Sequence, residues 1–355
     1  RYGLPEKIGG WSKVTTDGII GAVRASLTYS SLEGVKYAIY GTNKKLYAYS
    51  ENNYADISPV RASGTGNITQ FAVTNGSSTV IVTDADHGAL IGDFVTITTV
   101  SADVGGITQA NLQNEFEILT VPSTSTYTIE APAAGTSTAN GATANASYQI
   151  NTRPATSILG YGWGAGTWGD STWNSSREGL TGASGVLLEA GKWTLDSWGE
   201  DILSQQFNGG LFYWDTSAGL SSNRASTTEV SSAPTKSRIM LVSGDDRHVI
   251  CLGTETTVSD TSTQDNMFIR WSSQENQNEW TPSSINTAGS HRLTDGNFIQ
   301  AAVRSRGAIL IWTDTALYQM QFIGPPLTFG FKQLGSNCGS VGLNGVVDVN
   351  GIAYW

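Results

Sequence analysis

The pattern that decides the fold is clearest in the stretch Ala308-Ile309-Leu310-Ile311-Trp312-Thr313-Asp314-Thr315-Ala316-Leu317-Tyr318-Gln319-Met320. A short apolar segment runs into a small polar turn, and an aromatic-rich segment follows it. Branched and aromatic side chains favour extended strands, whereas small polar residues favour turns. The stretch therefore predicts a β-hairpin with strands over residues 308–312 and 317–320.

The same pattern occurs at four other places in the chain. These copies span residues 37–49, 202–214, 249–271 and 346–355. A single hairpin is too small to bury its own apolar face, so the copies must pack on one another. The second strands of three copies begin at Leu211, Met267 and Leu317, about 50 positions apart, which is close to the spacing of β-propeller blades. The alternative is a β-sandwich made of unrelated hairpins.

The composition also favours short strands joined by tight turns. The 355 residues include 41 Gly, 11 Trp and 13 Tyr, and only 14% are charged. No long stretch repeats its apolar residues at the helical spacing i, i+3, i+4, i+7. We therefore predict an all-β fold of β-propeller-like hairpin repeats.

Residues 60–153 interrupt the hairpin pattern. They are poor in Trp and in charge, and rich in Thr, Ser, Ala and Gly, with strand-like segments at 79–83, 94–98, 114–119 and 126–129. We predict a small β-sandwich or β-barrel domain inserted between two parts of the propeller, residues 1–59 and 154–355. The low-complexity segment Ala131–Ala146 is predicted to be a mobile loop or a return linker. Because the strand pattern stops abruptly at Trp355, we expect the C-terminal end of the propeller to be missing.

Charge and cysteine content exclude several classes of protein. The formal net charge of −10 argues against a basic face for binding nucleic acid. No apolar run reaches the roughly 18 residues of a membrane span. The two cysteines, Cys251 and Cys338, are either two buried thiols or one disulfide, and the sequence leaves this open.

The search for chemistry finds no catalytic pattern. Asp84, Asp86 and His87 could hold a cation, but they lack a further carboxylate at calcium-loop spacing, so a turn is favoured. His248 precedes an apolar strand and is predicted to lie in a surface β-turn. The sequence singles out no pair of acids for glycoside hydrolysis. It also contains neither a nucleophile elbow nor a phosphate-binding loop. We predict no catalytic residue, no metal and no cofactor, so the protein is predicted not to be an enzyme.

A Gly-rich stretch carries Trp163, Trp168 and Trp173 at a spacing that fits neither a strand nor a helix. We predict an irregular loop on one face of the propeller and treat these three residues as an interaction surface. Aromatic faces can stack on sugar rings, although Trp residues more often belong to the core. A carbohydrate-binding propeller or host-receptor adhesin is therefore one alternative function, and a glycosidase of propeller architecture is another.

One segment points to a particular protein family more specifically than the composition does. It runs Ile269-Arg270-Trp271-Ser272-Ser273-Gln274-Glu275-Asn276-Gln277-Asn278-Glu279-Trp280-Thr281-Pro282. Together with residues 1–11 and 322–326, it resembles the tail nozzle proteins of short-tailed bacteriophages, also called phage stabilisation or tail tubular B-type proteins. The resemblance covers residues 1–59 and 154–355 and does not reach the insert, whose role it leaves open.

This resemblance implies a β-propeller subunit of the virion tail that assembles as a ring, usually a homohexamer, below the portal and adaptor. The lumen of the ring would conduct DNA during genome ejection, and tail fibre or spike proteins would be further partners. The family carries no catalytic residues over to this sequence. The acidic net charge fits such a channel, because DNA slides without sticking where few Lys and Arg neutralise its phosphates.

Overall fold

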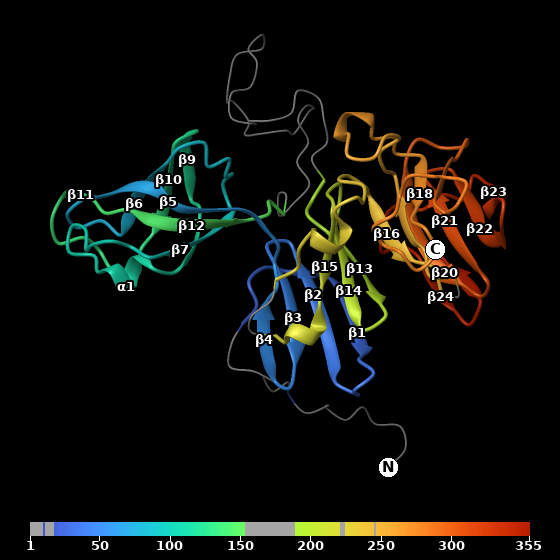
Figure 1. Cartoon of the computed structure of the whole chain (residues 1–355), viewed down its shortest axis with the longest axis horizontal. Coiled ribbons are helices and arrows are strands. Elements are labelled where there is room, and N and C mark those ends of the chain that lie inside the picture. The colour runs from blue at the N-terminus through green and yellow to red at the C-terminus, as the bar shows by residue number, and fades with distance from the viewer. Residues whose placement is uncertain (1–9, 11–17, 153–188, 221–223, 245) are drawn as a thin grey trace, which may run out of the picture.

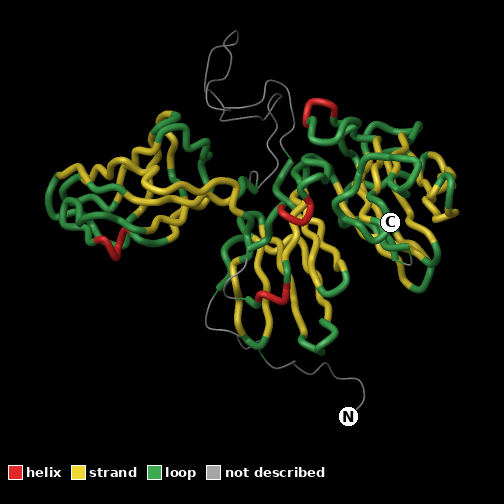
Figure 2. Tube along the Cα trace, viewed as in Figure 1, coloured by secondary structure: helices red, strands yellow, loops and turns green. Residues whose placement is uncertain are grey.

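The computed structural model describes residue 10 and residues 18–152, 189–220, 224–244 and 246–355. The described residues are almost entirely β-structure, with one short α-helix, α1 (Gln109–Leu112), and 3-10 turns at Thr216–Ala218, Thr228–Val230 and Thr261–Thr263 (Figure 2). The predicted all-β fold class is therefore confirmed. Among the described segments, no helix is both long and apolar enough to span a membrane.

Four antiparallel meanders, each called a blade here, form the propeller-like part (Figure 1). Blade 1 contains β1 (Val23–Ser30), β2 (Lys36–Thr42), β3 (Leu46–Ser50) and β4 (Asn53–Asp56). Blade 2 contains β13 (Trp193–Trp198), β14 (Asp201–Gln206) and β15 (Leu211–Trp214). Blade 3 contains β16 (Ile239–Val242), β17 (Val249–Leu252), β18 (Phe268–Trp271) and β19 (Gly289–Arg292). Blade 4 contains β20 (Ile299–Ser305), β21 (Ala308–Thr313), β22 (Ala316–Gly324) and β23 (Thr328–Ser336).

All five hairpins expected from the sequence are present. Four of them are the pairs β2–β3, β14–β15, β17–β18 and β21–β22, and the fifth joins β24 (Val347–Val349) to β25 (Ile352–Tyr354). At the turn of the fifth hairpin, Asn350 and Gly351 have φ angles of 55° and 84°. These positive values are the ones that a two-residue hairpin turn requires and that Asn-Gly readily adopts.

The apolar faces of the blades are buried against one another. One cluster joins blade 1 to blade 2, a second joins blade 2 to blade 3, and a third joins blade 3 to blade 4. At the first of these contacts, the indole of Trp193 packs on Gly41 and its Nε1 donates to the carbonyl of Thr42 at 2.9 Å. Face-to-face packing of successive meanders is the propeller solution to burying small sheets.

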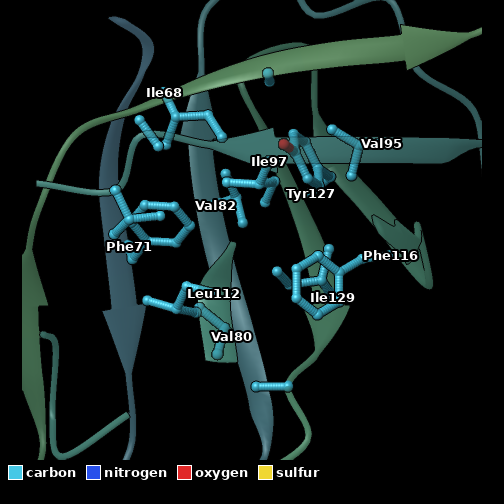
Figure 3. Packing of buried hydrophobic residues seen from close by; sticks show 14 of the residues in the cluster. Ile68, Phe71, Val80, Val82, Val95, Ile97, Leu112, Phe116, Tyr127 and Ile129 are labelled. Atoms are coloured by element: carbon cyan, nitrogen blue, oxygen red, sulfur yellow. The ribbon is translucent and has the colours of Figure 1, made fainter. Parts of the chain in front are cut away.

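Residues 60–149 form a separate eight-stranded sheet that lies to one side of blade 1 in Figure 1. Its strands are β5 (Val60–Val73), β6 (Thr79–Asp84), β7 (Phe94–Thr98), β8 (Glu115–Glu117), β9 (Thr120–Ser123), β10 (Thr126–Glu130), β11 (Ala139–Gly141) and β12 (Ala144–Gln149). The sheet encloses its own core, in which Phe71, Ile97 and Tyr127 are almost fully buried (Figure 3). We call residues 60–152 the insert.

The prediction of a mobile loop or linker over Ala131–Ala146 is wrong. This segment contains β11 and the beginning of β12, and β12 is an interior strand paired with both β5 and β7. Ala144 and Ala146 belong to the core of the insert. Their small side chains suit a strand that lies between two longer, branched neighbours, so tertiary pairing outweighs low β-propensity here.

Both cysteines are free. Cys251 lies in the apolar contact between blades 2 and 3, and burial raises the pKa of its thiol to about 12. Cys338 is partly buried beside blade 4. The alternative of two thiols therefore holds, and no disulfide links them.

Candidate functional site: an axial cavity and a charged junction

A cavity of about 730 Å³ lies where the first strands of the four blades meet. It is lined by residues of β1, β13, β16 and β20, together with Leu343 and Asn344 from the segment that follows blade 4. The amide of Asn344 donates to the carbonyl of Arg24 at 3.5 Å, so this segment returns to the first strand of blade 1. The cavity therefore occupies the axis around which the blades are arranged.

Asp196 joins three of these inner strands at the cavity wall. Its Oδ2 accepts from the backbone N–H of Val242 at 2.8 Å and pairs with Nη1 of Arg304 at 3.1 Å. The same Nη1 donates to the carbonyl of Val242 at 3.0 Å. Burial raises the pKa of the Asp196 carboxyl, although the Arg304 guanidinium opposes this change. Asp196 and the carbonyl of Val242 thus hold the Arg304 side chain in one position.

A second charged group ties the insert to blade 1. Lys45, in the turn between β2 and β3, is 2% exposed, and its Nζ pairs with Asp56 at 2.8 Å and with Glu115 of the insert. The ammonium also lies 4.3 Å from the centre of the Phe94 ring. Beside it, Lys44 pairs with Glu117 at 2.5 Å.

Further bonds complete this junction. Gln149 Nε2 donates to Glu115 at 2.7 Å and to Asp56 at 3.1 Å. Arg224 approaches both carboxylates, at 3.6 Å and 3.5 Å, and donates to the carbonyl of Ser58 at 3.1 Å. Burial alone would raise the pKa of Asp56, but Lys45 and Arg224 lower it. Asp56 therefore stays charged at neutral pH and, through Lys45 and Gln149, helps to hold the insert against blade 1.

The candidate cation ligands of the insert have structural roles instead. Asp84 accepts from Asn67 at 2.7 Å and from the hydroxyl of Tyr148 at 2.5 Å. His87 Nδ1 accepts from the backbone N–H of Ala89 at 3.0 Å. Asp86 has a φ of 53°, as expected in a turn. The described residues contain no group of three or more His, Cys, Asp or Glu side chains arranged to hold a metal ion.

The prediction of a surface turn for His248 is wrong. The side chain is fully buried, with Nδ1 at 2.7 Å from Asp246 Oδ2 and Nε2 at 3.0 Å from Thr287 Oγ1. The ring packs edge-on against Phe329, with 5.1 Å between ring centres. His248 therefore connects the turn between β16 and β17 to the segment that precedes β19.

The predicted interaction surface at Trp163, Trp168 and Trp173 lies outside the described residues. The sequence reasoning missed Lys45, Asp196 and Arg304, which organise the two charged groups described above. One signal was available for Asp196, because a lone acid stands between Trp193 and Trp198 in an otherwise strand-like segment. Its partners come from distant parts of the chain, and a local pattern cannot reveal them.

Comparisons with known proteins do not identify the family of this chain. No family model matches the chain, and no curated protein matches it. Among solved structures, the chain is similar to one described as phage phi92 endosialidase, with 13% sequence identity and a TM-score of 0.27. The match covers 88% of this chain and 50% of that one, so the chain spans about half the length of that protein. A likeness at this level identifies neither a shared fold nor a shared activity.

Proposed function

We propose that the chain is a structural subunit of a bacteriophage tail, a nozzle protein that forms a ring, usually a hexamer, below the portal and adaptor. The observation that carries the proposal is the segment Ile269–Pro282, on which the resemblance rests. It contributes β18 and the turn that follows, and both of its Trp residues, Trp271 and Trp280, are buried in the blade contacts. The motif thus belongs to the packing of a propeller-like blade, as a nozzle subunit requires.

In this proposal, DNA passes through the lumen of the ring and not through the axis of one subunit. The axial cavity of about 730 Å³ has the volume of a small-molecule site. The lumen would instead be enclosed by neighbouring copies of the chain. A net charge of −10 suits this role, because few cations would be available to hold the phosphates during genome ejection.

The insert would project from the ring as a docking surface for tail fibre or spike proteins, or for the host envelope. The insert contains seven acidic residues and a single Lys or Arg residue, Arg61. The acidic residues are Asp84, Asp86, Asp93, Asp103, Glu115, Glu117 and Glu130. The junction at Lys45 supports the proposal, since a docking surface transmits force only when it is held firmly to the ring.

The proposed role is structural and includes no catalytic step. Negative-stain microscopy of the purified chain tests it, and the expected images are closed rings of about six subunits. A gel-shift assay at physiological salt should find no stable complex with duplex DNA. A persistent monomer would contradict the proposal, and retention of DNA would contradict the assigned lumen.

The alternative of a carbohydrate-binding propeller or host-receptor adhesin makes a different prediction. Such a protein would bind glycans as a monomer, with Trp163, Trp168 and Trp173 as stacking platforms. A glycan array probed with the purified chain separates the two functions. Binding that is lost when the three Trp residues are replaced by Ala, in a chain that forms no ring, would favour the adhesin.

A further inference from the structure

The side chains of Lys45 and Glu115 meet end to end at the junction, although one comes from blade 1 and the other from the insert. Nζ of Lys45 contacts Oε1 of Glu115 and lies 2.8 Å from Oδ2 of Asp56. Lys45 is 2% exposed, and the centre of the Phe94 ring lies 4.3 Å from its Nζ. Little water therefore reaches the amine, and its position beside the Glu115 carboxyl group is fixed.

The backbone is held in place on both sides of this contact. The carbonyl of Lys45 accepts from the N–H of Thr42 at 2.8 Å, and its N–H donates to Thr42 Oγ1 at 2.8 Å. Glu115 begins β8 and is paired with Thr96 of β7. Two reacting groups held together in this way react within one molecule, which is faster by many orders of magnitude than a collision in solution.

The four charges around Lys45 sum to zero, and they still do after a proton moves from Lys45 to Glu115. Lys45 and Arg224 are the cations of this group, and Asp56 and Glu115 are the anions. A proton passed from Nζ to Oε1 leaves a neutral amine and a neutral carboxyl group. Asp56 and Arg224 then remain as a pair, with 3.5 Å between Oδ2 and Nη2. Because burial penalises charged groups, the neutral amine and acid are accessible at this site.

Glu115 is a better electrophile than Asp56. Although burial acts to raise the pKa of Asp56, Lys45 and Arg224 lower it, so this carboxylate stays ionised and resists attack. Oε2 of Glu115 accepts from Nε2 of Gln149 at 2.7 Å, and Gln149 is 2% exposed. A buried donor at this oxygen stabilises the negative charge that develops on it when the carboxyl carbon is attacked.

We propose that Lys45 and Glu115 form an intramolecular amide, an isopeptide bond that joins blade 1 to the insert. After the proton transfer, the lone pair of Nζ attacks Cδ of Glu115 and forms the C–N bond, while Asp56 takes one proton from the nitrogen. The bond from Cδ to Oε1 then breaks, and the hydroxyl group leaves as water with the proton that Asp56 returns. The net change is the loss of one water molecule.

The structure shows the two groups before they react, and until then Lys45 stays a charged member of the junction. Glu115 is 27% exposed, so the released water has a path to the solvent. Once formed, the bond would hold the insert to blade 1 covalently. This modification goes beyond the proposed nozzle role and does not depend on whether the chain forms a ring.

The test is the intact mass of the purified full chain, measured at intervals after purification. We expect the mass to fall by one water molecule. Fragmentation of a protease digest should recover a peptide that contains Lys45 joined to a peptide that contains Glu115, which distinguishes this reaction from loss of water elsewhere in the chain. A sample purified and kept in urea should not react, because the unfolded chain does not hold the two groups together.

Matched variants identify the reacting groups. Lys45→Met and Glu115→Ala each remove one of them and should abolish the crosslink. Asp56→Ala keeps both but removes the base, and should slow the crosslink at least about tenfold. Lys36→Met makes the same change as Lys45→Met at an exposed position of β2 and serves as the control, with the crosslink unchanged.

A folded wild-type chain that keeps its full mass on prolonged incubation would overturn the proposal, and this result does not depend on the folding of any variant. Recovery of Lys45 joined to Asp56 would contradict the choice of Glu115 as the acceptor. An unchanged rate in a folded Asp56→Ala variant would contradict the role of Asp56 as the base.

Discussion

At the scale of single residues, Lys45 is a buried cation that pairs with two carboxylates. Removing water from an ammonium group is costly unless opposite charges replace the solvent. Asp56 and Glu115 supply those charges from blade 1 and from the insert, respectively. One side chain therefore couples the stability of blade 1 to the docking of the insert.

Replacing Lys45 with Met should destabilise the propeller-like part by about 3 kcal/mol, because two carboxylates are left facing each other. Met keeps an apolar side chain of similar length beside the Phe94 ring but loses the attraction between the ammonium and the ring, so the loss is mainly electrostatic. The measurement is urea unfolding followed by Trp fluorescence, which reports on the blades because the insert contains no Trp. Lys44→Met removes a half-exposed partner of Glu117 and should cost less than about 1 kcal/mol. Equal effects of the two substitutions would contradict this account of the junction.

The pH dependence of the junction follows from Asp56. Its pKa is lowered in the folded chain, because Lys45 and Arg224 outweigh the effect of burial. A lowered carboxyl pKa gives stability that is present above the unfolded value of about 3.9 and is lost as the pH falls below it. The difference in unfolding free energy between the wild type and Asp56→Asn should therefore stay constant from pH 7 to about pH 5 and shrink below about pH 4.

The control for this pH series is Asp86→Asn. Asp86 is exposed in a turn, takes part in no ion pair within the described ranges, and has a positive φ that Asn tolerates. Its substitution should leave stability at pH 7 within about 0.5 kcal/mol of the wild type. A wild-type advantage over Asp56→Asn that does not shrink as the pH falls below about 4 would show that the charge of Asp56 is not what stabilises the junction.

At the scale of the elements, the contact between blades 1 and 2 depends on a missing side chain. A Cβ atom at Gly41 would lie 2.7 Å from three atoms of Trp193, which is itself almost fully buried. Gly41→Ala should therefore cost about 1–3 kcal/mol in urea unfolding, as overpacking does in other cores. Gly244→Ala meets open space and should stay within about 0.5 kcal/mol of the wild type. A neutral Gly41→Ala variant would mean that the two blades do not pack closely.

The role of β12 can be tested within the low-complexity segment itself. Ala146→Asp places a charge in the core of the insert and should cost about 3 kcal/mol or more. Ala134→Asp changes an exposed position of the same segment and should have little effect. Hydrogen exchange at the backbone amides of β6 and β10 provides the measurement. If both variants kept wild-type protection, β12 could not be an interior strand.

The sequence predicted the elements that are specified locally. The hairpin at Asn350-Gly351 and one hairpin in each blade follow from turn chemistry and from short apolar runs. These hairpins are β2–β3, β14–β15, β17–β18 and β21–β22. The strand β12 was missed because Ala, Asn and Ser have low β-propensity, and its two neighbours lie far away in sequence. His248 was missed for the same reason, since its burial depends on Phe329 and Thr287.

The candidate sites were less predictable than the fold. The axial cavity combines three or four consecutive residues from each of four blades, and each of these runs alone resembles an ordinary strand. The junction brings Lys45 to Glu115, which are separated by a 70-residue interval that crosses most of the insert. Neither arrangement has a spacing that a sequence motif could capture.

At the scale of the whole molecule, the described structure places two kinds of surface on one chain. The propeller-like part supplies packed blades around an axial cavity, and the insert supplies an acidic sheet fixed to blade 1 by buried charges. In the proposed ring, this junction would hold each insert to its own subunit. The nozzle proposal itself rests on the resemblance of the segment Ile269–Pro282.

The central claim is that this chain assembles into a closed ring, and the mass of the purified protein in solution tests it most directly. Mass photometry should find a dominant species of about six times the chain mass of 37.6 kDa, with few intermediate species, because a closed ring satisfies every interface. A single species of 37.6 kDa that persists as the protein concentration is raised would contradict the account.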